Sequence, residues 1–260
     1  MKKISVLLFW LICYSNIVAQ KPVSINALAL NADTFLGYDS LGAAYSIAEN
    51  VLTKWVQSEI KQFKNPQLGK ITRVDLQNPL KIIVFFQDFN TVILLDNQLT
   101  ETQKIDLSDN SNPLLAMGIG LASGNRLWLY DGLSQKIGLY DYTKKEFKKL
   151  TTPLANPIGY YETDFNYFKW IDAQRQAFRC DVYGKIENLG TVPPNEQLQW
   201  VTEAVLIYKK GQELYRYEFV GSKSTLIEID KKTFKNFSYK DQILSIFTDQ
   251  GITNYKISVP

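Results

Sequence analysis

The 260-residue sequence contains no histidine. Histidine is the general base of most serine and cysteine hydrolases, a common metal ligand and the side chain whose charge changes near neutral pH. Its absence excludes Ser-His-Asp and Cys-His catalysis, imidazole metal sites and a histidine pH switch.

Long apolar runs are also scarce, and the run that bears on targeting lies within the first nineteen residues. Lys2 and Lys3 precede an apolar stretch over residues 4–13, and Ala19 is a small residue at the expected cleavage site, as in a secretory signal peptide. The stretch is about half of the roughly 20 residues that span a membrane. We expect residues 1–19 to be a signal peptide and residues 20–260 a single exported domain that does not span the membrane. A buried N-terminal helix is the alternative.

Net charge and cysteine are scarce as well. The formal charge is +3, and removal of Lys2 and Lys3 leaves +1. A nearly neutral chain of mixed charges gives no electrostatic basis for binding nucleic acid. After loss of Cys13, only Cys180 remains, so the mature chain forms no internal disulfide. Its length, about 240 residues, is enough to bury a core without one.

Short strand-like runs rich in Val, Ile, Tyr, Phe and Trp fill the rest of the chain, with turn residues every 8–12 positions or so. Residues 52–63 fit a helix, but they also fit two strands with a turn near Gln57 and Ser58, and the neighbouring pattern favours strands. In residues 125–150, Leu-Tyr-Asp ends two successive runs, which predicts three antiparallel strands joined by two tight turns.

The same three-strand phrase recurs at 34–56, 83–107, 167–190, 205–230 and, in part, 242–259. The second strands are predicted near residues 36, 84, 127, 168, 206 and 245, a period of about 40. Further apolar runs at 69–76, 114–122, 157–162 and 198–204 are expected to be inner strands, where small residues such as Gly118 and Gly120 suit the crowded axis.

This period predicts an all-β fold, a β-propeller of six blades of about 40 residues. Five or seven blades remain alternatives because the first and last units are the least regular, and a β-sandwich is the alternative fold. The last unit is one strand short, and residues 22–30 supply a spare strand. We expect this mature N-terminal strand to complete the last blade and to cover an open sheet edge.

Over residues 27–259, the period and strand rhythm resemble short-blade propellers of the WD40 and NHL-like kind. The resemblance implies a rigid disc with loops on two faces. The Gly-His and Trp-Asp pairs of WD40 blades do not occur in this sequence. The resemblance names no ligand, because propellers host many unrelated functions.

Acidic residues recur where strands end. We interpret them as turn caps that accept backbone N–H groups; they are Asp39, Asp96, Asp131, Asp141, Asp172 and Asp230. The nearest approach to a calcium loop, Asp106 with Asp109 and Asn110, lacks a closing acid. The glycines of residues 118–125 lack the ending of a phosphate loop. We therefore predict no metal and no cofactor.

The candidate ligand-binding residues lie in one stretch and supply aromatic contact area and charge; they are Tyr160, Tyr161, Glu162, Asp164 and Trp170. One ring of the Tyr160–Tyr161 pair is expected to be exposed. Cys180 shares a strand face with Phe178 and is expected to be a buried hydrophobe. No catalytic residue is predicted.

The leading hypothesis is an exported, non-enzymatic propeller that binds an envelope protein as a scaffold, in the periplasm or at the outer surface. One alternative is a propeller hydrolase or lactonase that works through carboxylates or a metal, with Glu162, Asp164 and Glu203 in its channel. Another is a secreted binder of a glycan or small ligand, with aromatic residues at the channel mouth.

Overall fold

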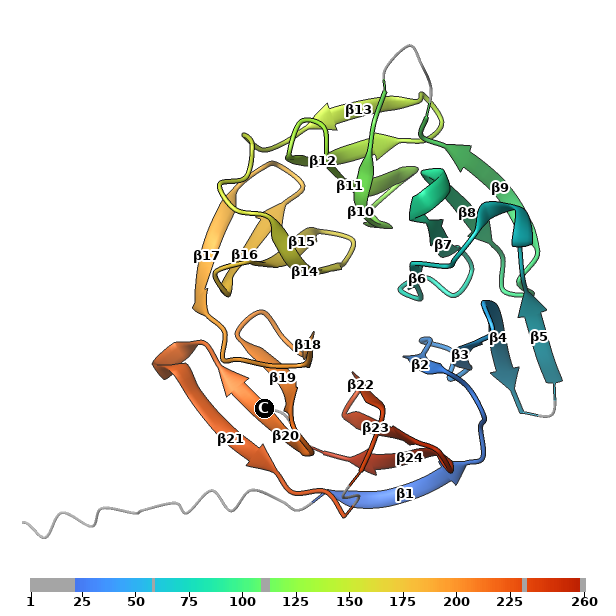
Figure 1. The fold of residues 1–260 in the computed structure, drawn as a ribbon, viewed down its shortest axis with the longest axis vertical. Helices are drawn as coiled ribbons and strands as arrows, with labels where there is room; N and C mark the ends of the chain where they lie inside the picture. Colours follow the sequence, from blue (N-terminus) through green and yellow to red (C-terminus); the bar gives the residue numbers. More distant parts are fainter. Residues whose placement is uncertain (1–21, 58, 109–112, 231–232, 258–260) are drawn as a thin grey trace, which may run out of the picture.

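The computed structural model describes residues 22–57, 59–108, 113–230 and 233–257. These residues form six four-stranded antiparallel sheets arranged around an axis (Figure 1). The prediction of an all-β, six-bladed propeller is confirmed. The predicted signal peptide, the loop residues Asp109 and Asn110 and residues 231–232 lie outside the described residues.

Each blade is described from its innermost strand, next to the axis, to its outermost strand. Blade 1 contains β2 (Thr34–Tyr38), β3 (Ala44–Ala48), β4 (Val51–Val56) and β5 (Glu59–Phe63). Blade 2 contains β6 (Arg73–Asp75), β7 (Ile82–Phe86), β8 (Thr91–Leu95) and β9 (Glu101–Asp106). Blade 3 contains β10 (Ala116–Leu121), β11 (Arg126–Asp131), β12 (Lys136–Asp141) and β13 (Glu146–Lys149).

Blade 4 contains β14 (Ile158–Thr163), β15 (Tyr167–Asp172), β16 (Gln176–Asp181) and β17 (Ile186–Thr191). Blade 5 contains β18 (Gln197–Trp200), β19 (Val205–Lys210), β20 (Glu213–Glu218) and β21 (Lys223–Ile227). Blade 6 contains β22 (Asn236–Lys240), β23 (Ile243–Thr248), β24 (Gly251–Lys256) and β1 (Val23–Leu28). The described residues also form three short 3-10 helices, which are η1 (Pro66–Leu68), η2 (Gln87–Phe89) and η3 (Val220–Ser222). Within the described ranges no helix is long and apolar enough to cross a bilayer.

The N-terminal strand closes the ring, as the sequence predicts. β1 pairs antiparallel with β24, from Val23 opposite Lys256 to Leu28 opposite Ile252. The first described strand therefore becomes the outermost strand of the last blade (Figure 1). The chain continues directly from β1, in blade 6, to β2, in blade 1. The first and last blades are therefore connected through this strand.

The four predicted inner strands are β6, β10, β14 and β18, and residues 52–63 form β4 and β5 rather than a helix. One assignment is wrong. Residues 34–38, predicted as the second strand of the first unit, are its inner strand β2, and the second strand is β3. β3 reads AYSIA, and its small residues give a weak strand signal beside the aromatic run of β2.

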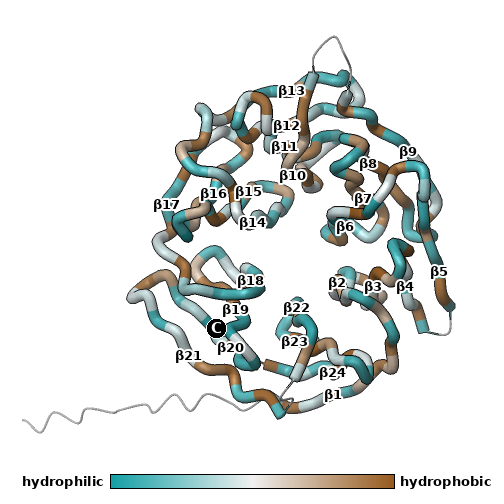
Figure 2. The backbone as a smooth tube through the Cα atoms, in the orientation of Figure 1, coloured by the Kyte–Doolittle hydropathy of each residue, from teal (hydrophilic) through white to brown (hydrophobic). Residues whose placement is uncertain are grey.

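The hydrophobic core lies between blades. Among the described residues, buried side chains form six clusters, one at each seam between neighbouring blades. At the seam of blades 2 and 3, for example, Ile83 and Phe85 pack with Leu127 and Leu129. Figure 2 shows the contrast with the hydrophilic outer strands β9 and β13. Burial of these apolar surfaces stabilises the stacked sheets and keeps the charged edges in water.

The aspartates at strand ends cap turns. Asp96 Oδ1 accepts hydrogen bonds from the backbone N–H groups of Gln98 and Thr100, each at 2.8 Å. Two or more backbone N–H groups are accepted in the same way at Asp39, Asp131, Asp141 and Asp172. The capping interpretation is therefore confirmed for these five residues; Asp230 borders the undescribed residues 231–232.

Two faces follow from the topology, because antiparallel strands alternate in direction. The loops that join first to second and third to fourth strands leave on one side, which we call face 1. The loops that join second to third strands, and those that join successive blades, leave on the opposite side, which we call face 2.

Candidate functional site: the channel and the two faces

Glycines on β10 shape the central channel. A Cβ atom on Gly120 would lie 1.8 Å from Thr163 Oγ1, and one on Gly118 would lie 3.2 Å from the Phe168 ring. β10 can therefore lie close to β14 only because it lacks side chains at these positions. β6 and β14, from the non-adjacent blades 2 and 4, contact each other across it, and Thr163 Oγ1 lies 3.5 Å from Asp75 Oδ2.

Arg73 is the central cation of this contact. Its guanidinium lies 4.2 Å from the centroid of the Tyr161 ring, and Nη1 donates a hydrogen bond to the Tyr161 carbonyl oxygen at 3.3 Å. Its Nε is buried without a partner. Burial lowers the pKa of Arg73, but the neighbouring Tyr161 and Asp75 outweigh that effect and raise it overall. The guanidinium stays charged and can bind an acceptor group.

Glu162 is the acidic residue of strand β14. Its Oε1 accepts hydrogen bonds from the Tyr160 hydroxyl at 2.8 Å and from the Trp200 backbone N–H at 3.0 Å. Burial raises the pKa of Glu162 above its ordinary 4.5, against the opposing effects of these hydrogen bonds and of Arg73. Because Trp200 belongs to blade 5, Glu162 joins two inner strands.

The channel holds a cavity of about 510 Å³ lined by the inner strands of blades 1, 2, 4, 5 and 6. Arg73, Asp75, Glu162 and Gln199 are among its lining residues. Towards face 1, its wall includes Asp164, whose Oδ2 is 2.9 Å from Lys169 Nζ, and the exposed Phe165.

The five sequence-predicted residues are only partly brought together. Glu162 and Asp164 line the channel cavity. The expectation of an exposed ring at Tyr160 or Tyr161 is wrong, because both are half-buried. Tyr160 stacks on the Trp200 indole and Tyr161 on the Phe168 ring. Trp170 is 3% exposed and packs in the seam of blades 3 and 4.

Two further residues weighed in the sequence are also placed. Glu203 lies in the turn between β18 and β19, where its carboxylate is 2.5 Å from Arg179 Nη1. Cys180 is fully buried in the seam of blades 3 and 4, as predicted, and burial raises the pKa of its thiol to about 12. Neither Glu203 nor Cys180 is among the residues that line the channel cavity.

The sequence reasoning missed Arg73, Asp75 and Gln199. A signal was available, since the predicted inner run at 69–76 contains the charged residues Arg73 and Asp75, which are unusual in a buried strand. Their roles are largely structural. Asp75 Oδ2 accepts from the Leu121 N–H at 2.8 Å, and the Gln199 side chain bonds both backbone groups of Tyr239 at 2.7–2.8 Å.

Asp75 and Glu162 are therefore engaged in joining inner strands and do not form a free pair of acids. Asp75 holds blade 3 and Glu162 holds blade 5. Across the described part of the chain, no group of three or more Cys, Asp or Glu side chains is placed to hold a metal ion. The arrangement can recognise a group through Arg73, but it lacks a poised acid–base pair.

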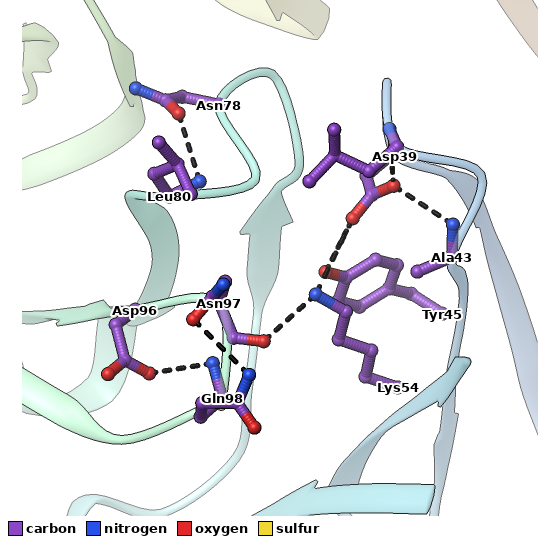
Figure 3. Close-up of polar contacts among 10 residues, drawn as sticks. Asp39, Ala43, Tyr45, Lys54, Asn78, Leu80, Asp96, Asn97 and Gln98 are labelled. Atoms are coloured by element: carbon purple, nitrogen blue, oxygen red, sulfur yellow. Dashed lines mark hydrogen bonds and ion pairs between the residues drawn. The ribbon is translucent and has the colours of Figure 1, made fainter. Parts of the chain in front are cut away.

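A second buried polar cluster joins blades 1 and 2 on face 1 (Figure 3). Asp39 Oδ2 accepts from the Tyr45 hydroxyl at 2.9 Å and lies 3.7 Å from Lys54 Nζ. Lys54 Nζ also donates to the Asn97 carbonyl oxygen of blade 2 at 2.9 Å. Burial raises the pKa of Tyr45, and so do the charge of Asp39 and the hydrogen bond that the Tyr45 hydroxyl donates to Asp39. Asp39, Tyr45 and Lys54 are all buried, so the cluster is a clamp between blades.

Face 2 carries exposed apolar side chains over blades 2 and 3, which we call the face-2 patch; its members are Phe89, Leu115, Met117 and Leu133. Leu115 and Met117 both lie over Gly132, since a Cβ atom there would meet Leu115 Cδ2 at 3.3 Å and Met117 Cγ at 2.8 Å. Gln87 Nε2, two residues before Phe89, lies 3.4 Å from Met117 Sδ. The Phe89 ring lies on the same face beside Gly69, where a Cβ atom would meet its Cε2 at 3.2 Å.

No protein-family model and no curated protein matches the sequence. Solved structures do match the fold. Virginiamycin B lyase from Staphylococcus aureus superposes with a TM-score of 0.57 at 12% identity, over 85% of this chain and 79% of the lyase. A catalytically inactive form of that lyase, with one histidine replaced by alanine and with quinupristin, gives 0.57 at 12% identity, over 90% of this chain and 82% of the lyase.

PorZ of Porphyromonas gingivalis, described as an essential bacterial surface component of the type-IX secretion system, superposes with a TM-score of 0.50 at 14% identity. The match covers 90% of this chain and 34% of PorZ. At such identities these likenesses show the β-propeller fold and nothing finer.

Proposed function

We propose that this protein is an exported, non-enzymatic β-propeller that docks a partner protein at the cell envelope, in the periplasm or on the outer surface. The observation that carries the proposal is the face-2 patch. Four large apolar side chains, each more than two-fifths exposed, lie on one face of the propeller, and Leu115 and Met117 meet over Gly132. Exposed apolar side chains that gather on one face are typical of a protein-binding site.

The composition of the face-2 patch supports docking. Aromatic residues and methionine are enriched at the centres of interfaces, where an aromatic anchor and a flexible thioether fill a partner's pockets. Phe89 and Met117 offer both. The patch stands on β10 and on turns braced by buried hydrogen bonds, so little order has to be gained when the partner binds.

The residues of the channel give little support to the hypothesis that the protein is an enzyme. The lyase with a similar fold is inactive when one of its histidines is replaced, and this sequence has no histidine. A carboxylate hydrolase needs two acids aimed at one bond, whereas Asp75 and Glu162 each accept backbone N–H groups of a neighbouring blade. The description of PorZ as a bacterial surface component agrees with an envelope role for this fold.

Export and docking are tested by two experiments. Mass determination of the chain recovered from its native host should show that residues 1–19 have been removed; retention of those residues would contradict export. Affinity capture of the tagged mature chain from gently solubilised envelopes should yield one partner in a fixed ratio to the chain. Its dependence on the face-2 patch decides whether docking uses that surface.

A further inference from the structure

A polar hollow of about 360 Å³ lies on face 1 at the seam where blade 6 meets blade 1. Its floor is one cross-strand row of blade 6, in which Ser238, Ser245, Asn254 and Asn26 pair in register across all four strands. Tyr38 of blade 1 and Ile25 and Ile243 of blade 6 also line it. We call this hollow the seam pocket.

Short side chains create the seam pocket. Ser245 is the third residue of the second strand of blade 6, and the corresponding residues are Trp128 in blade 3 and Ile207 in blade 5. Those two side chains are fully buried and fill their seams. At the same place in blade 6, a serine, with Asn254 beside it, leaves space. Polar residues also stand at this place in blade 1 (Ser46) and blade 4 (Lys169), but the row of blade 6 consists of four short polar side chains. Buried polar groups are costly for stability unless something else uses them.

Asn254 carries an unmet hydrogen-bonding group in the pocket. The residue is 6% exposed, and its Nδ2 donates to Asn26 Oδ1 at 2.8 Å and to the Tyr38 hydroxyl oxygen at 2.9 Å. These two bonds fix the amide, and its Oδ1 is buried with no partner. A buried acceptor without a donor costs about 1–3 kcal/mol. A ligand or water that donates a hydrogen bond to Asn254 Oδ1 would remove this cost.

The charges at the rim narrow the ligand class. Asp39 and Asp241 line the pocket and disfavour an anion, while Lys240 beside them disfavours a cation. The floor offers hydroxyls that both donate and accept, together with the Asn254 acceptor. Ile25 and Ile243 provide an apolar wall. A neutral ring that carries several hydroxyls and an apolar C–H face matches all of these features.

We propose that the seam pocket binds one neutral sugar unit. A sugar hydroxyl would donate to Asn254 Oδ1, further hydroxyls would exchange hydrogen bonds with Ser238 and Ser245, and the C–H face would lie against Ile243. The proposal is independent of partner docking, because the seam pocket lies on face 1 and the face-2 patch on the opposite side.

The test fills the pocket without disturbing the rest of the fold. Ser245→Ile copies the isoleucine that blade 5 has at the corresponding position. It should preserve or raise Tm, because it replaces a hollow with apolar contacts. The matched control is Ser224→Ile, the same change on the exposed outer strand β21 of blade 5. If Ser245→Ile does not fold, Ser245→Val provides a smaller filling.

The probes are glucose, galactose, mannose, N-acetylglucosamine and their β-1,4 disaccharides, measured with the mature chain by saturation-transfer NMR and titration calorimetry. At least one should bind with a Kd of about 1 mM or tighter. That affinity should fall at least tenfold in Ser245→Ile and stay unchanged in Ser224→Ile. Failure of every probe to bind, or equal binding by Ser245→Ile, would overturn the proposal.

Discussion

Asn50 and Asn90 make the same pair of hydrogen bonds to the backbone of the next blade, one repeat of about 40 residues apart. Both follow the second strand of their blade and have positive φ angles, 64° and 48°. Each side-chain amide donates to one carbonyl and accepts from the N–H two residues later, at 2.7–2.9 Å (Asn50 with Gly69 and Ile71, Asn90 with Leu114 and Ala116). Asparagine suits this place because it tolerates the left-handed conformation and bonds backbone on both sides.

The first prediction concerns this pair of hydrogen bonds from an asparagine to the next blade, which we call the asparagine staple. Asn90→Ala should lower the free energy of unfolding by about 3 kcal/mol, because it leaves a buried N–H and a buried carbonyl unpaired and puts alanine in a left-handed conformation. Urea denaturation followed by tryptophan fluorescence measures the loss. Asn78→Ala is the control; Asn78 caps a turn through the Leu80 N–H alone, and the cost there should be about 1 kcal/mol or less. Equal costs at the two sites would contradict the staple.

The second prediction compares two similar aspartate caps. Asp39 and Asp96 each accept two backbone N–H groups through Oδ1, but only Asp39 also meets a buried tyrosine and lysine. Asp39→Asn should cost about 3 kcal/mol, because it leaves Lys54 buried without a carboxylate. Asp96→Asn should cost about 1 kcal/mol. Thermal and urea unfolding of the two variants would show the difference, and similar losses would mean that the Lys54 clamp is unimportant.

The third prediction is a pH dependence at Glu162. Its pKa in the folded protein is raised above 4.5 by burial, so the stability linked to its protonation is present below about pH 4.5 and lost as the pH rises through the raised value. Glu162→Gln keeps an oxygen for both accepted hydrogen bonds and cannot ionise. Its stability relative to the unaltered protein should therefore increase with pH above 4.5, as measured by urea unfolding at a series of pH values.

Glu187→Gln is the opposite-signed control for that series. The hydrogen bond from Lys185, and then that from Arg179, lowers the pKa of the Glu187 carboxyl. Its ionised form therefore favours the fold, and the variant should lose stability relative to the unaltered protein as the pH rises from the folded pKa to the ordinary value of 4.5. A Glu162→Gln curve with the same sign as this control would contradict the assigned effect of burial.

The fourth prediction concerns Cys180. Its thiol is fully buried and has a pKa of about 12, so almost no thiolate exists at pH 8 and reagents have no access to it. The folded mature chain should not react with Ellman's reagent over an hour, and one thiol should react promptly in 6 M guanidinium. Rapid reaction in the folded protein would show an accessible, activated cysteine, and would reopen a catalytic role.

The sequence was sufficient for features that repeat locally. Strand runs, aspartate turn caps and the spare strand at residues 22–30 each leave a signal within a few residues, and these predictions are confirmed. Contacts between blades leave no such signal. Arg73 meets Tyr161 across a whole intervening blade, and it does so only because β10 has glycine at Gly118 and Gly120.

The same limit explains the errors at the candidate site. Alternation along β14 predicts that one of Tyr160 and Tyr161 faces outward, but each ring finds a stacking partner, Trp200 and Phe168. Likewise, the seam pocket arises from four short side chains on four strands, one of them from the far N-terminal end of the described chain. Only the closed ring brings that row together.

The most direct test of the proposed docking function is envelope capture with matched face variants. Leu133→Glu places a charge in the face-2 patch, and Leu80→Glu makes the same change on face 1 at a residue of similar exposure, 65% against 61%. Tagged mature chains are captured under the same conditions and the partner's recovery is quantified by mass spectrometry. The account predicts that Leu133→Glu reduces recovery at least tenfold and that Leu80→Glu leaves it unchanged. Equal recovery by both variants, or no reproducible partner for the unaltered chain, would contradict it.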